Sequence, residues 1–142
     1  MTLSEQMGMP YQIFPHPASA ATQAIMEHQY KVIDEKDVDG LMSDYAEDAF
    51  FLTPYTAFRN RNEIRAFYTA YMAKTPQGFL EAIVTERLTI LGEVAYILWS
   101  AEPWLSLSTA TWVVRGGKIV YQTAMPNPNS EALKKLYMGI YA

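Results

Sequence analysis

In the first half of the chain, apolar residues recur at steps of three and four, the spacing that places them on one face of a helix. This pattern predicts three helices, over residues 18–35, 37–45 and 62–75. Asp37 and Asn62 stand at the starts of the second and third helices, where a side-chain oxygen can accept bonds from free backbone N–H groups. The aromatic run 50–53 predicts a strand between them, and Pro54 closes it.

The second half of the chain consists of stretches rich in β-branched and aromatic residues, separated by turn signals. It predicts four strands, over residues 80–91, 94–102, 105–115 and 118–125. Gly116-Gly117 is a two-residue hairpin signal, and Asn129 or Ser130 caps a last helix. Helices followed by a run of antiparallel strands indicate an α+β fold, because a doubly wound parallel sheet needs alternating strands and helices.

Residues 1–17 form an extended N-terminal arm, in which Pro10, Pro15 and Pro17 exclude a helix. The apolar residues between these prolines fit an arm packed on the domain or on a partner subunit, and a mobile tail is the alternative. Residues 18–142 contain no internal repeat and no long linker, so they are predicted to form a single domain.

Composition narrows the possible partners. The chain has 142 residues, of which half are apolar and 18% are charged, so it has enough apolar material for a core. Its net charge of −4 without a basic run argues against nucleic acid as a partner. Cysteine is absent, and no apolar run approaches the roughly 18 residues of a membrane span. The N-terminus has no signal-peptide pattern, so no membrane association and a cytoplasmic location are expected.

The stretch Asp37–Phe67 contains a short acidic helix start, the segment Tyr45–Ala49, an apolar strand ending at Pro54, and a helix carrying Ile64–Phe67. This order resembles the front half of the nuclear-transport-factor-2-like superfamily, in its SnoaL-like and ketosteroid-isomerase-like branch. The resemblance extends over about residues 20–126. It implies a cone-shaped, curved antiparallel sheet wrapped around three N-terminal helices, with a short C-terminal helix and an apolar pocket.

The resemblance also implies where the isomerase-like members carry their polar pocket residues. A polar residue of the first helix corresponds to Gln29, and an acid before the proline of the first strand corresponds to Thr53. A second acid, on the second-last strand, corresponds to Ala110. Since neither acid is present, ketosteroid isomerase activity is not expected, and whether the protein is an enzyme stays open.

Alternation along residues 94–102 places Glu102 on one face with Ser100 and Leu98, and this face is predicted to line the pocket. A carboxylate in an apolar pocket holds its proton more tightly and can serve as general acid or base, so Glu102 is the candidate catalytic residue. The alternative is that Glu102 ends its strand in water. The candidate ligand-binding residues are Gln29, Tyr45, Thr53, Phe67, Tyr71, Trp112 and Gln122.

Both faces of the predicted sheet are largely apolar, so the sheet needs a cover on each side. The helices cover one face, and a second copy of the chain is the simplest cover for the other. The sequence therefore predicts a homodimer with Trp99, Tyr121 and Thr123 in the contact. No nucleophile, zinc or phosphate-loop motif is present, so neither a metal site nor a cofactor is predicted.

Three functions remain open at this point. The first is a SnoaL-like enzyme that isomerises, cyclises or dehydrates a small molecule with Glu102 as acid or base. The second is a non-catalytic module that binds a small apolar ligand in the same pocket. The third is a dimeric scaffold whose cone is filled by side chains. An open cavity with an ionisable group favours the first, and a cavity without one favours the second.

Overall fold

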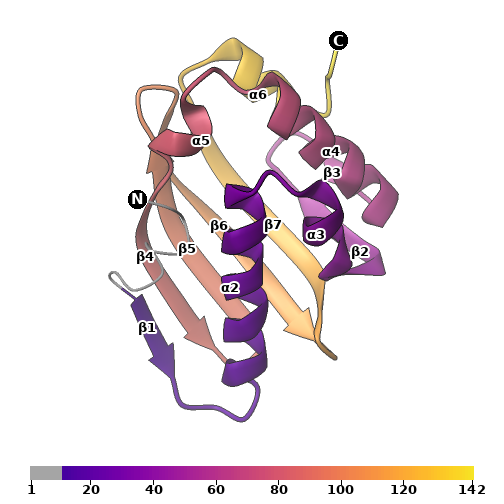
Figure 1. The fold of residues 1–142 in the computed structure, drawn as a ribbon, viewed down its shortest axis with the longest axis vertical. Coiled ribbons are helices and arrows are strands. Elements are labelled where there is room, and N and C mark those ends of the chain that lie inside the picture. Colours follow the sequence, from indigo (N-terminus) through magenta and orange to yellow (C-terminus); the bar gives the residue numbers. More distant parts are fainter. Residues whose placement is uncertain (1–10) are drawn as a thin grey trace.

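The computed structural model describes residues 11–142 and places helices on one face of a curved, seven-stranded sheet (Figure 1). The helices are α2 (Ser19–Asp34), α3 (Val38–Ser43), α4 (Arg61–Lys74), α5 (Phe79–Ala82) and α6 (Glu131–Tyr137). The strands are β1 (Tyr11–Phe14), β2 (Tyr45–Leu52), β3 (Ala57–Phe58), β4 (Val84–Leu91), β5 (Val94–Ala101), β6 (Leu105–Arg115) and β7 (Lys118–Pro128). The predicted α+β class is confirmed. Of the predicted N-terminal arm, residues 1–10 lie outside the described residues.

The strands are ordered β1-β4-β5-β6-β7-β2-β3 across the sheet. The strands β4 to β7 follow one another through short turns, and neighbours among them pair antiparallel. The pairs β1–β4 and β2–β7 are parallel, because helices separate the two strands of each pair along the chain. The curved sheet is therefore mixed near its two sides and antiparallel in its centre.

The helix α2 runs across the sheet, and α3 and α4 lie on the same side of it (Figure 1). We call the face that these helices cover the inner face and the opposite one the outer face. Alternation decides which strand residues are buried on the inner face: on β4, Leu88 and Ile90 are fully buried, whereas Leu91 is exposed. The main core thus lies between the inner face and the helices.

Polar side chains set the starts of the helices much as the sequence predicts. The Asp37 carboxylate accepts a bond from the Gly40 N–H at the start of α3, and Ser130 caps α6. The prediction for α4 was wrong by two residues. Its cap is Asn60, whose side chain accepts from the Glu63 N–H.

Two element boundaries differ from the predictions. Residue Tyr45, expected at the end of the second helix, begins β2, because α3 ends at Ser43 and is followed by its C-cap Asp44. The predicted strand from residue 80 begins only at Val84, because Gly78 adopts a left-handed conformation with φ of 88° and starts the short helix α5. Local turn chemistry therefore overrides the apolar pattern at this point.

The strand β1 comes from the predicted arm and pairs in parallel with β4, in the register Tyr11 with Leu88 and Phe14 with Leu91. It extends the sheet at the side opposite to β3. Within residues 11–142, no helix combines the length and the hydrophobicity needed to cross a bilayer.

Candidate functional site

A cavity of about 90 Å³ lies between the inner face of the sheet and the helices α2 and α4. The helix α2 contributes Met26, Gln29, Tyr30 and Ile33, which are spaced i, i+3, i+4 and i+7 and therefore share one face. Met26, Gln29 and Tyr30 are at most 5% exposed. The amphipathic pattern of this helix thus places one buried amide, that of Gln29, at the cavity wall.

The cavity exists because small side chains pair in the middle of the inner face. Ala110 of β6 lies directly opposite Ala124 of β7 and opposite Ile97 of β5, and all three line the cavity. The neighbouring pair on β6 and β7 is Trp112 and Gln122, which are much larger. The short side chains of Ala110 and Ala124 leave an empty space, and the larger side chains of Trp112 and Gln122 bound it on one side.

Aromatic side chains of α4 and α6 form the wall opposite this floor. The ring centroid of Phe67 lies 5.1 Å from that of Tyr68, 5.3 Å from that of Tyr71 and 5.5 Å from that of Tyr137. The hydroxyl oxygens of Tyr71 and Tyr137 are 3.3 Å apart. Tilted and edge-on contacts of this kind stabilise the wall beyond the area that they bury.

On one side of the cavity, three side chains form a ring of hydrogen bonds, which we call the closed network: Tyr45, Tyr68 and Gln122. The Tyr45 hydroxyl donates to Gln122 Oε1, and Gln122 Nε2 donates to the Tyr68 hydroxyl at 3.0 Å. The two hydroxyl oxygens are 3.3 Å apart, so Tyr68 can donate to Tyr45 and complete the ring. Both polar atoms of the Gln122 amide therefore have partners inside the protein.

Burial keeps these tyrosines protonated. It raises the pKa of Tyr30 to about 12 and that of Tyr45 and Tyr71 well above 10.0. It also raises the pKa of Tyr68, while hydrogen bonds from Tyr45 and Gln122 act in the opposite direction. At neutral pH these hydroxyls can donate or accept hydrogen bonds, but they do not act as bases.

The other polar group of the cavity, Gln29, is held by the α3 region. Its Nε2 donates to Asp44 Oδ2 at 2.8 Å and to the Leu41 carbonyl oxygen at 3.3 Å. The same Asp44 oxygen lies 2.5 Å from His28 Nδ1. His28 is half exposed, whereas Asp44 is 8% exposed, so this chain of contacts leads from the surface to the cavity wall.

Three buried polar atoms in the cavity lining have no hydrogen-bond partner among the described residues: Gln29 Oε1, Trp99 Nε1 and Trp112 Nε1. Burial raises the pKa of Tyr45, and the nearby Trp112 indole acts in the opposite direction, although its Nε1 does not meet the geometry of a hydrogen bond. We call these three side chains the open set. Buried polar atoms are nearly always paired in folded proteins, so the open set is unusual.

The structure brings five of the eight predicted site residues together around this cavity: Gln29, Phe67, Tyr71, Trp112 and Gln122. The other three do not line it. Tyr45 lies behind Gln122 in the closed network, and the Thr53 hydroxyl donates to the Tyr137 carbonyl oxygen at 2.8 Å. Glu102 is exposed in the turn that follows β5.

The placement of Glu102 in the pocket was wrong because the two faces of β5 were exchanged. Directly opposite residues of neighbouring strands point to the same face, and β5 pairs Ile97 with Ala110 and Trp99 with Ser108. Since Ala110 faces the cavity, Ile97 and Trp99 face it too, and Tyr96 lies on the outer face. Glu102 follows the end of the strand and has no cavity to enter.

The same exchange overturns the predicted position of Trp99. This residue lines the cavity instead of the outer face, whereas Tyr121 and Thr123 of β7 are exposed on the outer face as expected. The sequence did suggest that Trp112 points into the pocket, and Trp112 pairs with Ala95 of β5. Knowing this pair would have placed Ala95, Ile97 and Trp99 on the inner face. The pair could not be read from the sequence, because the register of the two strands depends on the irregular turn between them.

Several lining residues were missed although the sequence carries a signal for some of them. Met26, Tyr30 and Ile33 follow from Gln29 by helical periodicity alone. Tyr68 follows from Ile64, Phe67 and Tyr71 by the same helical spacing, but the sequence does not show its hydrogen-bonding role. Its role depends on Tyr45 and Gln122, which are distant in the sequence.

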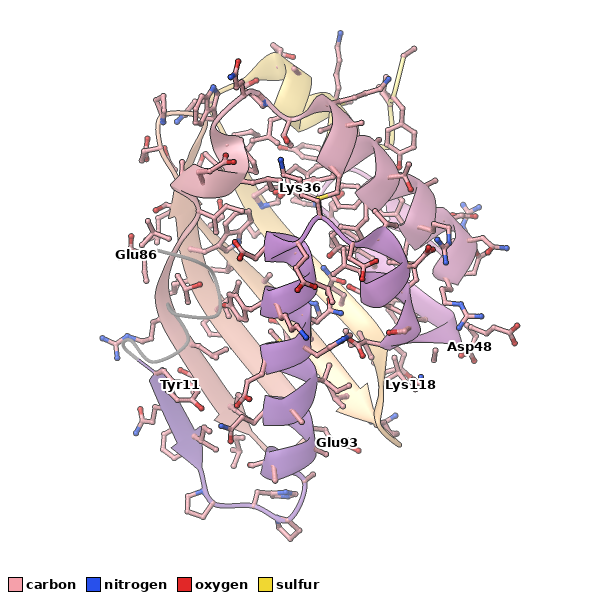
Figure 2. All side chains as sticks on the ribbon, in the orientation of Figure 1. Tyr11, Lys36, Asp48, Glu86, Glu93 and Lys118 are labelled. Atoms are coloured by element: carbon pink, nitrogen blue, oxygen red, sulfur yellow. The ribbon has the colours of Figure 1, made fainter. Side chains whose placement is uncertain are left out.

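Among the described residues, no Asp, Glu, Lys, Arg or His side chain lines the cavity. The charged residues Asp48, Glu86, Glu93 and Lys118 lie around the rim of the molecule (Figure 2). Within the described part of the chain, no cluster of three or more His, Cys, Asp or Glu side chains could hold a metal ion. The site can therefore bind a neutral molecule through apolar contact and a few hydrogen bonds.

Solved structures share this architecture at low sequence identity. A nuclear-transport-factor-2-like protein of unknown function from Mesorhizobium loti is 19% identical with a TM-score of 0.65, and the match covers 82% of this chain and 98% of that one. A steroid delta-isomerase from Pseudomonas aeruginosa is 18% identical with a TM-score of 0.64, covering 87% and 93%. A protein of unknown function with a cystatin-like fold from Methylobium petroleophilum is 19% identical with a TM-score of 0.63, covering 82% and 83%.

No curated protein matches the chain. The sequence model of the SnoaL-like domain matches residues 26–122, which is more than half of the chain. The matched span begins at Met26 and ends at Gln122, both of which line the cavity. The chain therefore belongs to the SnoaL-like domain family.

Proposed function

We propose that this SnoaL-like protein binds a small, neutral, largely apolar molecule in the cavity between α2, α4 and the sheet. The observation that supports this proposal is the make-up of the described wall, whose residues are aliphatic and aromatic with a few hydrogen-bonding groups and no charged side chain. Apolar walls with a few convergent polar groups are the usual composition of small-molecule sites.

Binding is a better proposal than acid–base catalysis. The solved structures of similar fold include a steroid delta-isomerase, but at this low identity the likeness concerns the fold alone. In this chain the two positions where isomerase-like acids are expected hold Thr53 and Ala110, and Glu102 lies in an exposed turn. The described residues of the cavity wall therefore supply no carboxylate or imidazole to transfer a proton.

Filling the cavity tests this proposal. Toluene is a suitable probe, and ligand-observed NMR together with the shift in melting temperature reports its binding. The variant Ala110→Leu places a branched side chain on the cavity floor and is expected to abolish binding. The matched control is Thr109→Leu, one residue away on the other face of β6, which should bind like the unmodified protein. Toluene binding that survives in Ala110→Leu would contradict the proposed site.

We also propose that a second copy of the chain covers the outer face. A row of uncharged side chains crosses this face at Tyr96, Thr111, Thr123 and Leu52, which pair from strand to strand. Tyr96 is 42% exposed and Met125 is 60% exposed. This row carries no charge and can pack against its own copy, with Arg87 and Arg115 standing to either side of it on the same face.

Sedimentation at micromolar concentration tests the dimer. The unmodified protein should sediment as a dimer, and Tyr96→Glu should weaken association by about 2 kcal/mol or more if Tyr96 is a hot spot. The control Tyr55→Glu changes a tyrosine of similar exposure in the loop between β2 and β3, and should leave the dimer intact. If the unmodified protein sediments as a monomer at this concentration, the proposed dimer is wrong.

A further inference from the structure

The side-chain amide of Gln29 has one orientation that its neighbours accept. Its Nε2 faces Asp44 Oδ2 at 2.8 Å and the Leu41 carbonyl oxygen at 3.3 Å. Both of these atoms are acceptors, so a flipped amide would set Oε1 against a carboxylate oxygen. The amino group of Gln29 is therefore directed toward α3, and Oε1 occupies the other branch of an amide that lines the cavity.

The anchor of this amide is itself fixed. The carboxylate of Asp44 lies 2.5 Å from His28 Nδ1 and is largely buried. The backbone N–H of Asp44 also bonds to the Leu41 carbonyl oxygen at 3.2 Å. Since both acceptors that hold Gln29 are tied to the same helix end, the position of Oε1 is defined before any ligand binds.

Oxygen Oε1 of Gln29 has no partner although the residue is only 2% exposed. The indole N–H groups of Trp99 and Trp112, which line the same cavity, are also unpaired. Among its amide and indole atoms, the described lining thus holds one unused acceptor and two unused donors. Because the closed network uses both polar atoms of Gln122, the open set supplies the amide and indole atoms that are left for a ligand.

The size of the cavity limits the ligand. Its volume is about 90 Å³, whereas an apolar cavity of about 150 Å³ is known to hold benzene. Two flexible side chains, Met26 and Met72, line the cavity and can rotate to enlarge it. With these side chains rotated, a single ring is the largest group that the space can hold, and a fused polycyclic molecule does not fit.

The absence of charge in the wall limits the polar group of the ligand. A carboxylate would be buried without a cation and would face the acceptor Oε1 of Gln29. A pure hydrocarbon would leave that acceptor unpaired. A hydroxyl group is the smallest neutral group that both donates and accepts a hydrogen bond.

We infer that the ligand is a compact, neutral hydroxyl compound of one ring, whose O–H donates to Gln29 Oε1 and whose oxygen meets an indole N–H of the open set. This inference rests on the proposed binding function and narrows its ligand class. It assigns to Gln29 the role of selecting a hydroxyl group against a methyl group at the same position.

Three one-ring probes test the inference on the intact protein: phenol, toluene and benzoate. Affinities are measured by titration with NMR detection for the unmodified protein and for Gln29→Met, which keeps the length of the side chain and removes the acceptor. Phenol is expected to bind to the unmodified protein, and benzoate is not. In Gln29→Met the ratio of phenol to toluene affinity should fall about tenfold, because the buried hydroxyl loses its acceptor. The control Gln23→Met changes a glutamine of the same helix that does not line the cavity, and should leave the ratio unchanged.

The outcomes separate the two proposals. Toluene binding without phenol binding in the unmodified protein would overturn this inference and leave the proposed function intact. So would an unchanged ratio in a folded Gln29→Met variant, as shown by circular dichroism. If neither toluene nor phenol binds, the proposed function fails and this inference fails with it. Because the comparison in the unmodified protein needs no variant, the test holds even if Gln29→Met does not fold.

Discussion

Two glutamines line the same cavity, and they differ in what they leave unused. Gln122 accepts from Tyr45 and donates to Tyr68, so both of its polar atoms are satisfied within the sheet and α4. Gln29 donates to Asp44 and keeps an unpaired oxygen. Residue type and burial are the same for both, since they are 3% and 2% exposed. Only the inventory of hydrogen bonds separates a structural amide from a candidate ligand-binding one.

This difference indicates how stability and binding are divided around the cavity. A closed network stabilises the fold because losing any member leaves buried polar atoms unpaired. The three unpaired atoms of the open set make no hydrogen bond within the fold, so they are free to bond to a ligand. The comparison therefore predicts large stability effects on one side and large affinity effects on the other.

Alkaline pH should ionise the buried tyrosines Tyr30, Tyr45 and Tyr68, whereas the amide and indole groups of the open set do not titrate. Below pH 10 these tyrosines are protonated in both the folded and the unfolded chain, and their contribution to stability is fully present. Above pH 10 the unfolded chain ionises first, because burial raises the pKa of Tyr30 to about 12 and also raises that of Tyr45 and Tyr68. By pH 11, Tyr30 alone should lower the free energy of unfolding by about 1.4 kcal/mol.

Urea denaturation at pH 9 and pH 11 measures this loss. The buried tyrosines together should lower the free energy of unfolding by more than Tyr30 alone does. The variant Tyr30→Phe removes one ionising group, so its stability should fall by about 1.4 kcal/mol less between the two pH values. If the free energy of unfolding falls equally in both proteins, burial does not raise the pKa of Tyr30.

The same substitution at the two glutamines sharpens the comparison directly. Gln122→Met leaves the Tyr45 hydroxyl without its acceptor and the Tyr68 hydroxyl without its donor, and should cost about 2–4 kcal/mol of unfolding free energy. Gln29→Met should cost about 1 kcal/mol, because Asp44 keeps its contact with His28. Urea denaturation at pH 7 checks both values. A larger loss for Gln29→Met would reverse the assignment of the structural and the ligand-facing amide.

The smallest effect is expected at Glu102. This residue is exposed and lies outside the cavity wall, so Glu102→Gln should change the free energy of unfolding by no more than about 0.5 kcal/mol. The affinity for toluene should also be unchanged, as measured by the same NMR titration. A marked loss of toluene binding in this variant would show that Glu102 belongs to the binding site. The difference between the two glutamines would then not be enough to explain binding.

Local patterns in the sequence were sufficient for the class of the fold and for most helices. The step of three and four residues predicts α2 with its buried face, and Asp37 and Ser130 mark the starts of α3 and α6. Parallel pairing of β1 with β4 was not predictable in the same way. It depends on how the chain returns after its helices, which no local window contains.

For the site, the sequence by itself predicted a first helix with Gln29 on the face that meets the core, since helical periodicity is a local property. The resemblance read from the sequence also predicts that Thr53 and Ala110 stand where isomerase-like members carry their acids. Only the tertiary structure decided that Glu102 stands in water and Trp99 faces the cavity, because the face of a strand depends on its register with the neighbouring strand. It also decided which glutamine keeps an unpaired oxygen, since the partners of both amides come from segments distant in the sequence.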